Sequence, residues 1–481
     1  MSTSLRPSTN PRYVTLLLGA LTVLIACVIA RPEAAAAQGL KIGFADGLFT
    51  SKEGPDRSEW LGRAPQTGAS IIRLNVRWAV VAPKKPPAGF EAANPAAVGY
   101  EWATLDAAVR EATADDLKIF FTVYQAPTWA EGGQRPKNAE PGSWEPSAGA
   151  FGEFAQALAG RYNGTFPDPS DPGSSLPAVN YYEAWNEPNL SVYLAPQWDG
   201  GENRGSNLYR GLLNSFYAGV KRGSPRAKVL AGSLAPFGEE PGGTRTRPVL
   251  FLRNLLCLEG GVLRKTACPE PARFDILSDH PIAVGPPTQS ATSPLDVTTP
   301  DLGRLTKVLE KAEQTKRALP AGKKPLWVTE FWYDTNPPDP NGLSLATQAR
   351  WYEQDLYLFW KQGAQVAIAL QLRDSPEGKS YALTYQSGAY FLDGSPKPSA
   401  TAFKFPFVAQ RTGPFKAAVW GIAPHGGKVR VQAFRGGSWK TLATLSSKGL
   451  GRPFTGEIDL LRFAKLRAVI GGDSSLPWLQ R

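Results

Sequence analysis

Two glutamates lie in segments whose composition suits carboxylate chemistry. Glu187 lies in the stretch 181–188 and Glu330 in the stretch 326–332, and both stretches are apolar and aromatic-rich. Cleavage of a glycosidic bond needs one acid that protonates the leaving oxygen and a second carboxylate that attacks carbon or activates water. Burial raises the pKa of a carboxyl group, which suits the acid. The two glutamates are therefore candidates for a catalytic pair.

The chain around these glutamates alternates short apolar runs with longer amphipathic stretches. This pattern predicts parallel strands joined by right-handed helical crossovers. We expect strands over 40–44, 70–76, 117–124, 180–185, 228–234, 275–279, 326–330 and 366–372, and helices over 105–113, 151–162, 208–222, 249–258, 302–318 and 347–362. Eight such units indicate an α/β fold, a (β/α)8 TIM barrel, whose active site lies where the strands end. An open doubly wound sheet is the alternative, but residues 43–47 lack its Gly-rich turn.

A different pattern begins after about residue 407. Short runs over 416–422, 428–434, 439–445, 456–460 and 466–470 are separated by Gly, Ser and Pro. Residues 429–433 alternate with period two, which is typical of a half-buried strand. We therefore predict a barrel domain over 38–407 and a small C-terminal β-sandwich domain over 408–481.

The net charge of +11 is concentrated in this C-terminal segment. Residues 411–481 carry twelve Lys and Arg against three Asp and Glu. The expected barrel is close to neutral, which argues against nucleic acid as the main substrate. The basic segment is expected either to contact an anionic cell-surface polymer or to be a solvated face without a partner.

The stretch Trp185-Asn186-Glu187-Pro188 resembles the Asn-Glu-Pro signature of clan A glycoside hydrolases, and Thr329-Glu330-Phe331 resembles their nucleophile motif. The resemblance covers about residues 40–405 and is similar in character to the family 5 and family 39 branches. It implies that Glu187 is the acid/base, that Glu330 is the nucleophile, and that the enzyme retains anomeric configuration through a covalent glycosyl-enzyme.

The same resemblance suggests three helper residues. Asn186 would contact the sugar 2-hydroxyl, and Arg73, at the end of the second strand, would bind Glu330 through a charge-assisted hydrogen bond. His280, at the end of the sixth strand, would face the catalytic pair. A purely structural salt bridge for Arg73 and a packing role for His280 are the alternatives.

Three tryptophans near strand ends are candidate platforms for sugar rings: Trp78, Trp129 and Trp332. For each of these tryptophans, the alternative is a packing role in the barrel core. Two departures from the clan pattern concern the sugar subsite: residues 369–374 lack the Trp that many members place after the eighth strand, and Ile282 stands where a Tyr often follows His-Pro.

The N-terminal residues indicate export. A basic start, an apolar run over 13–30 and small residues over 34–37 predict a signal peptide over 1–37. A retained membrane anchor and lipidation at Cys27 are the alternatives. In a secreted protein, Cys257 and Cys268 are expected to form a local disulfide.

The sequence calls for no cofactor and no metal. Of the two histidines, His425 lies in the C-terminal segment, so a His-rich metal site is not available, although an all-carboxylate site stays formally open. We therefore predict a secreted retaining glycosidase that acts on a poly- or oligosaccharide. A catalytically inert carbohydrate-binding or cell-envelope barrel is the alternative.

Overall fold

Eight parallel strands close into a barrel, as the sequence predicted. A computed structural model describes residues 39–376, 378, 380–381, 384–460 and 464–480. The strands are β1 (Lys41–Ala45), β2 (Ile71–Arg77), β3 (Lys118–Tyr124), β4 (Tyr181–Ala184), β5 (Lys228–Leu234), β9 (Ile276–Asp279), β11 (Leu326–Phe331) and β14 (Ala364–Leu370). They pair in the order β1-β14-β11-β9-β5-β4-β3-β2, and β1 also pairs with β2. The closed ring excludes the open-sheet alternative.

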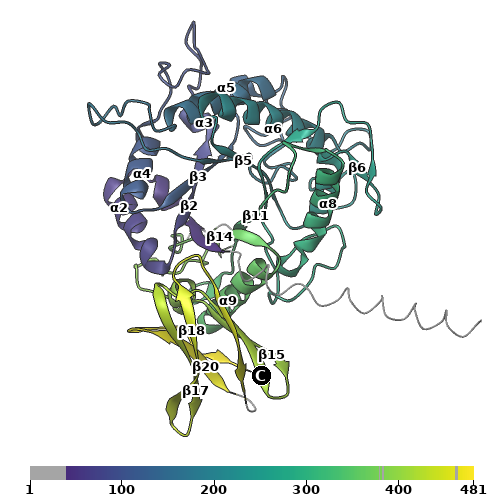
Figure 1. Cartoon of the computed structure of the whole chain (residues 1–481). Helices are drawn as coiled ribbons and strands as arrows, with labels where there is room; N and C mark the ends of the chain where they lie inside the picture. The colour runs from purple at the N-terminus through teal and green to yellow at the C-terminus, as the bar shows by residue number, and fades with distance from the viewer. Residues whose placement is uncertain (1–38, 377, 379, 382–383, 461–463, 481) are drawn as a thin grey trace, which may run out of the picture. The chain divides into compact units, whose positions relative to one another are not determined.

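Helices surround the strands (Figure 1). They are α2 (Gly54–Arg63), α3 (Trp78–Val81), α4 (Ala103–Ala114), α5 (Ala148–Arg161), α6 (Arg204–Gly223), α7 (Pro248–Leu255), α8 (Gly303–Gln314), α9 (Leu345–Lys361) and α10 (Pro398–Lys404). Side-chain caps fix the starts of three of them: Ser147, Asn203 and Ser344 each accept a hydrogen bond from the backbone three residues on. Helices α2, α3 and α10 were not predicted from the sequence.

One apolar layer fills the inside of the barrel. It consists of side chains from seven of the eight strands, namely Ala45, Ile71, Phe120, Leu230, Ile276, Trp327, Val366 and Ile368. With this layer closed, the barrel is a packed core and not a pore. Groups that act on a ligand must therefore lie above it, toward the C-terminal ends of the strands.

The C-terminal residues form two antiparallel sheets, which confirms the predicted β-sandwich. One sheet contains β15 (Phe407–Gly413), β16 (Lys416–Gly421) and β19 (Phe454–Asp459). The other contains β17 (Gly426–Arg435), β18 (Ser438–Lys448), β20 (Lys465–Ile470), β21 (Asp473–Ser474) and β22 (Trp478–Leu479). Helix α9 contacts the first sheet: Tyr357 Oη donates to Gln410 Oε1 at 3.0 Å.

The loop after α7 carries the predicted disulfide between Cys257 and Cys268. It holds a two-stranded hairpin of β6 (Leu258–Glu259) and β7 (Arg264–Lys265). The remaining short strands are β8 (Ala272–Arg273), β10 (Ala318–Leu319), β12 (Thr335–Asn336) and β13 (Leu343–Ser344). None of the helices described here is both long and apolar enough to span a bilayer. The predicted signal peptide lies outside the described residues.

Candidate active site

A polar layer lies directly above the apolar layer of the barrel. Because strand side chains alternate between the two faces, residues two positions beyond an interior residue also face the interior. Ile71 is thus followed inside the barrel by Arg73, Phe120 by Thr122, and Trp327 by Thr329. The register of β11 against β14 shifts between Val328 and Phe331. This irregularity lets Glu330 join Thr329 on the inside, although the two residues are adjacent in sequence.

Arg73 is the centre of this layer and is 2% exposed. Its Nη1 donates to Glu330 Oε2 at 2.9 Å, its Nη2 to Asn186 Oδ1 at 2.5 Å, and its Nε to Thr122 Oγ1 at 2.8 Å. One guanidinium thus binds side chains from β3, from the loop after β4 and from β11. The planar fork of donors fixes their relative positions, which a lysine ammonium would not do.

A second, fully buried carboxylate balances the charge of Arg73. Glu183 lies with its Oε2 4.0 Å from Arg73 Nε, and it accepts hydrogen bonds from Thr122 Oγ1 at 2.6 Å and from Thr329 Oγ1 at 3.0 Å. Burial of a charge is costly unless the charge is paired and hydrogen-bonded, and Glu183 is both. Glu183 therefore helps to keep the Arg73 guanidinium in place, and Arg73 in turn positions Glu330 and Asn186.

We expect Arg73→Met to destabilise the fold by about 3–5 kcal/mol, because it leaves Glu183 buried without its cation. Urea unfolding measures the loss. The double variant Arg73→Met/Glu183→Gln should recover part of it, since it removes both charges together. Arg77→Met, on the same strand but exposed, is the matched control, with an expected change below about 0.5 kcal/mol. Equal losses in the two arginine variants would contradict this account.

Glu187 follows β4 in a strained turn. The backbone φ angles of Trp185 and Glu187 are 73° and 41°. Residues other than glycine seldom adopt such positive φ values. The backbone N of Glu187 donates to Ser233 O at 3.1 Å, and Trp185 Nε1 donates to Tyr193 O at 2.9 Å, so neighbouring segments hold the turn. Strained backbone of this kind is typical of functional sites.

His280 lies between Glu187 and Arg73. Its side chain is fully buried; Nδ1 lies 3.0 Å from Glu187 Oε1, and Nε2 lies 3.4 Å from Arg73 Nη1. The cationic guanidinium disfavours a proton on Nε2, so the neutral ring carries its proton on Nδ1 and donates to Glu187. Because Oε1 of Glu187 then accepts, its other oxygen is the one that carries a proton when Glu187 is protonated.

Burial sets the proton affinities of this pair. It raises the pKa of Glu187 to about 7, and the positive charges of Arg73 and Arg245 oppose part of that increase. Burial also lowers the pKa of His280 to about 4, against the opposing effect of the Glu330 charge. Near neutral pH the imidazole is therefore uncharged, while Glu187 exchanges its proton readily. A raised pKa on a carboxyl group suits a general acid.

The two glutamates approach each other closely. One ligand atom each from Glu187, His280 and Glu330 lies within 4.8 Å of the others. Three such groups have the composition of a metal site, which the sequence did not call for. However, the Arg73 guanidinium already places a positive charge 2.9 Å from Glu330 and 3.4 Å from His280, and that charge repels a second cation.

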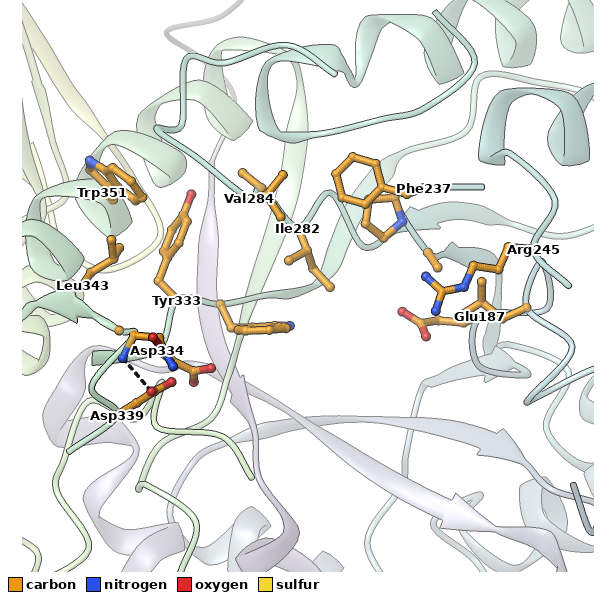
Figure 2. A pocket seen from close by; sticks show the side chains of 17 residues that line it. Glu187, Phe237, Arg245, Ile282, Val284, Tyr333, Asp334, Asp339, Leu343 and Trp351 are labelled. Atoms are coloured by element: carbon orange, nitrogen blue, oxygen red, sulfur yellow. Dashed lines mark hydrogen bonds between the residues drawn. The ribbon is translucent and has the colours of Figure 1, made fainter. Parts of the chain in front are cut away.

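A cleft of about 470 Å³ opens beside Glu187 (Figure 2). Arg245 lies near Glu187 at one end, and Asp334 and Asp339 lie at the other end. Apolar side chains also line the cleft, namely Leu190, Phe237, Ile282, Val284, Trp332 and Trp351. Ile282, one of the two departures from the clan pattern, is thus part of the apolar wall next to Glu187.

A second hollow of about 450 Å³ has Tyr124, Tyr193 and Arg77 in its wall. The rings of Tyr124 and Tyr193 lie 6.1 Å apart. The negative charges of Glu187 and Glu330 contribute to raising the pKa of Tyr193, after the larger effect of burial. Tyr193, in the wall of this second hollow, is therefore close enough to Glu187 and Glu330 for their charges to act on it.

The three tryptophan predictions have different outcomes. Trp332 lines the cleft and lies edge-on to Tyr385, with ring centroids 5.3 Å apart. Trp78 is fully buried and stacks on Phe154, so it offers no ring face to a ligand, and its expected platform role is wrong. Trp129 is half-buried with Nε1 donating to Pro83 O at 2.8 Å, and its platform role stays a prediction.

Sequence reasoning missed three residues of this site: Glu183, Arg245 and Tyr385. A charged residue inside the apolar strand 181–184 was a usable signal for Glu183, because such a residue needs a buried partner. Arg245 and Tyr385 lie on long loops without periodicity, so nothing local marked them. Tyr385 is 41% exposed, and burial together with the charges of Glu330 and Glu187 raises its pKa to about 12.

Comparison with protein-family models gave no match, and neither did comparison with curated proteins. Among solved structures, the chain is similar to a family 39 glycoside hydrolase from the gut symbiont Bacteroides cellulosilyticus WH2, at 17% identity and a TM-score of 0.54, over 88% of this chain and 82% of that one. It is also similar to GH5_18 from Streptomyces cattleya, solved in complex with GlcNAc, at 12% identity and a TM-score of 0.50, over 76% and 79%. The chain therefore shares the barrel fold of clan A glycoside hydrolases.

Proposed function

We propose that this protein is a retaining glycoside hydrolase in which Glu187 is the acid/base and Glu330 is the nucleophile. The observation that carries the proposal is the close approach of the two carboxyl groups, since one oxygen of Glu187 lies within 4.8 Å of one oxygen of Glu330. Retaining enzymes hold their carboxyl groups about 5 Å apart, whereas inverting enzymes leave about 6.5–9.5 Å for a water molecule. The separation therefore favours direct attack by a carboxylate.

The proposed reaction has two steps. In the first, Glu187 gives its proton to the glycosidic oxygen, the bond from that oxygen to the anomeric carbon breaks, and Glu330 forms a bond to the same carbon. In the second, Glu187 takes a proton from water, the water oxygen attacks the anomeric carbon, and Glu330 leaves. Arg73 positions Glu330 and holds Asn186 Oδ1, so the Asn186 amide nitrogen is left to donate to the sugar 2-hydroxyl.

The pH dependence follows from Glu187. Because the protonated form acts in the first step, kcat/KM should fall tenfold per pH unit above the pKa of about 7. His280 cannot produce this limb, because its pKa lies at about 4. A pH–rate profile measures the effect. Glu187→Gln, which cannot titrate, should show a low rate without the limb, and persistence of the limb in that variant would assign it to another group.

Covalent trapping tests the mechanism. A panel of 2-deoxy-2-fluoro glycosides with activated leaving groups should label the protein, and peptide mass spectrometry should place the sugar on Glu330. Labelling of any other residue would contradict the assignment. Absence of both labelling and turnover across a broad panel of glycosides would favour the inert carbohydrate-binding alternative.

The finer assignments about export and domain limits are part of this proposal. The predicted signal peptide over 1–37 implies secretion, and the Cys257–Cys268 disulfide is compatible with an extracellular protein. The division into a barrel over 38–407 and a β-sandwich over 408–481 places the whole proposed catalytic machinery in the first part.

A further inference from the structure

The outer face of the sheet formed by β18, β17 and β20 presents a set of five cations, of which four are exposed and Arg467 is half-buried. In β17, Val429, Val431 and Ala433 are buried, so the alternate residues point outward. The register places Lys448 opposite Gly426 and Arg467 opposite Gln432, on the same outer side. We call this surface the basic face, and its cations are Lys428, Arg430, Lys448, Lys465 and Arg467.

No acidic residue occurs in the three strands that form the basic face. The ion pairs that the described C-terminal residues form involve other cations: Lys404 and His425 with Asp473, and Lys416 with Glu457. Lys428 Nζ has a neutral partner, Ser446 Oγ at 3.1 Å. Like charges on neighbouring strands repel, so five cations without a carboxylate among them favour an anionic ligand.

An aromatic pair adjoins these cations. The rings of Phe434 and Trp439 lie 5.3 Å apart, and Phe434 is 45% exposed. The Arg467 guanidinium carbon lies 4.2 Å from the centroid of the Trp439 ring, and Arg467 Nε donates to Gln432 Oε1 at 3.0 Å. These contacts across all three strands hold the Arg467 guanidinium in place on the face instead of leaving it free in solvent.

We propose that the basic face is a binding site for an anionic polysaccharide. Lys428 and Arg430 lie two residues apart on one strand, about 7 Å along it, and Arg467 lies on the neighbouring strand. Such an array matches an extended chain that bears carboxylates at intervals. The exposed Phe434 ring adds surface on which a sugar ring can stack. The choice of a glycan over a nucleic acid rests on the proposed function of the barrel, since a glycosidase gains from being held on its substrate.

The test uses the full chain carrying Glu330→Ala, so that turnover does not interfere. Titration with a polygalacturonate oligomer should give measurable binding, and a neutral mannan oligomer should give none. The variant Arg430→Gln/Arg467→Gln should bind at least about tenfold more weakly. The control variant Arg411→Gln/Lys416→Gln loses the same charge from the other sheet and should bind as the parent does. Raising the salt from 50 to 300 mM should weaken parent binding about tenfold or more.

Three outcomes would overturn this inference: equal binding of the neutral glycan, equal weakening in the control variant, or tighter binding of duplex DNA than of polygalacturonate. If Arg430→Gln/Arg467→Gln does not fold, Lys428→Gln/Lys448→Gln replaces it, because Lys428 has a single neutral partner on the surface. Binding is measured without catalysis. Loss of binding therefore leaves the proposed glycosidase intact, and a missing glycosidase activity leaves this binding result interpretable.

Discussion

Replacement of Glu330 by alanine should lower kcat by at least about 10⁴-fold while the protein stays folded, since no covalent intermediate can form without the nucleophile. Among the described residues, the carboxylate of Glu330 has one close cationic partner, Arg73 Nη1 at 2.9 Å, and its side chain is 16% exposed. The fold therefore does not depend on it as it depends on Glu183. Steady-state kinetics on an aryl glycoside, with a thermal unfolding curve beside it, measure both parts of the prediction.

Azide separates loss of the nucleophile from general damage to the site. The small anion fits the space that the carboxylate leaves and attacks the anomeric carbon from the same side as Glu330. We expect azide to restore turnover of Glu330→Ala and to give a glycosyl azide of inverted configuration. Glu202→Gln, an exposed change in the segment before α6, is the control and should keep the parent rate. Near-parent activity of Glu330→Ala on every substrate would refute the assignment.

Replacement of Glu187 by alanine should have an effect that depends on the leaving group. General acid catalysis contributes about 10²–10⁴-fold. For glycosides with poor leaving groups, the rate should therefore fall by that factor, because the leaving oxygen must be protonated as the bond breaks. Glycosides with strongly acidic leaving groups should lose little in the first step. A plot of rate against leaving-group pKa is consequently expected to be much steeper for Glu187→Ala than for the parent.

The outcome with azide again distinguishes the two roles. In Glu187→Ala the nucleophile is still present, so azide should attack the glycosyl-enzyme and give a glycosyl azide of retained configuration. His280→Phe is a useful comparison: it removes the hydrogen bond at Glu187 Oε1 and keeps the carboxyl group. We expect the loss of kcat/KM in His280→Phe to be smaller than in Glu187→Ala. We also expect the alkaline limb of its pH–rate profile to lie at a different pH from that of the parent. A glycosyl azide of inverted configuration from Glu187→Ala would contradict the assignment and indicate that Glu187 is the nucleophile and Glu330 the acid/base.

Local sequence patterns determined most of the architecture. The eight expected strands each lie within two residues of an observed strand boundary, because a buried parallel strand is a continuous apolar run and an amphipathic helix has its own period. The same patterns placed Glu187 and Glu330 at strand ends, where a barrel collects its functional groups. Two cysteines eleven residues apart in one loop were likewise enough to predict their disulfide.

Only the tertiary structure decided how close these groups lie and what surrounds them. The distance between Glu187 and Glu330 depends on the register of eight strands and on the irregularity in β11, which no single segment encodes. The burial of Trp78 depends on helix α5, which supplies Phe154 from 76 residues away in the chain. The place of Arg245 beside Glu187 is set by loop contacts. Periodicity reports which side of an element is buried; it does not report which residues of other elements meet there.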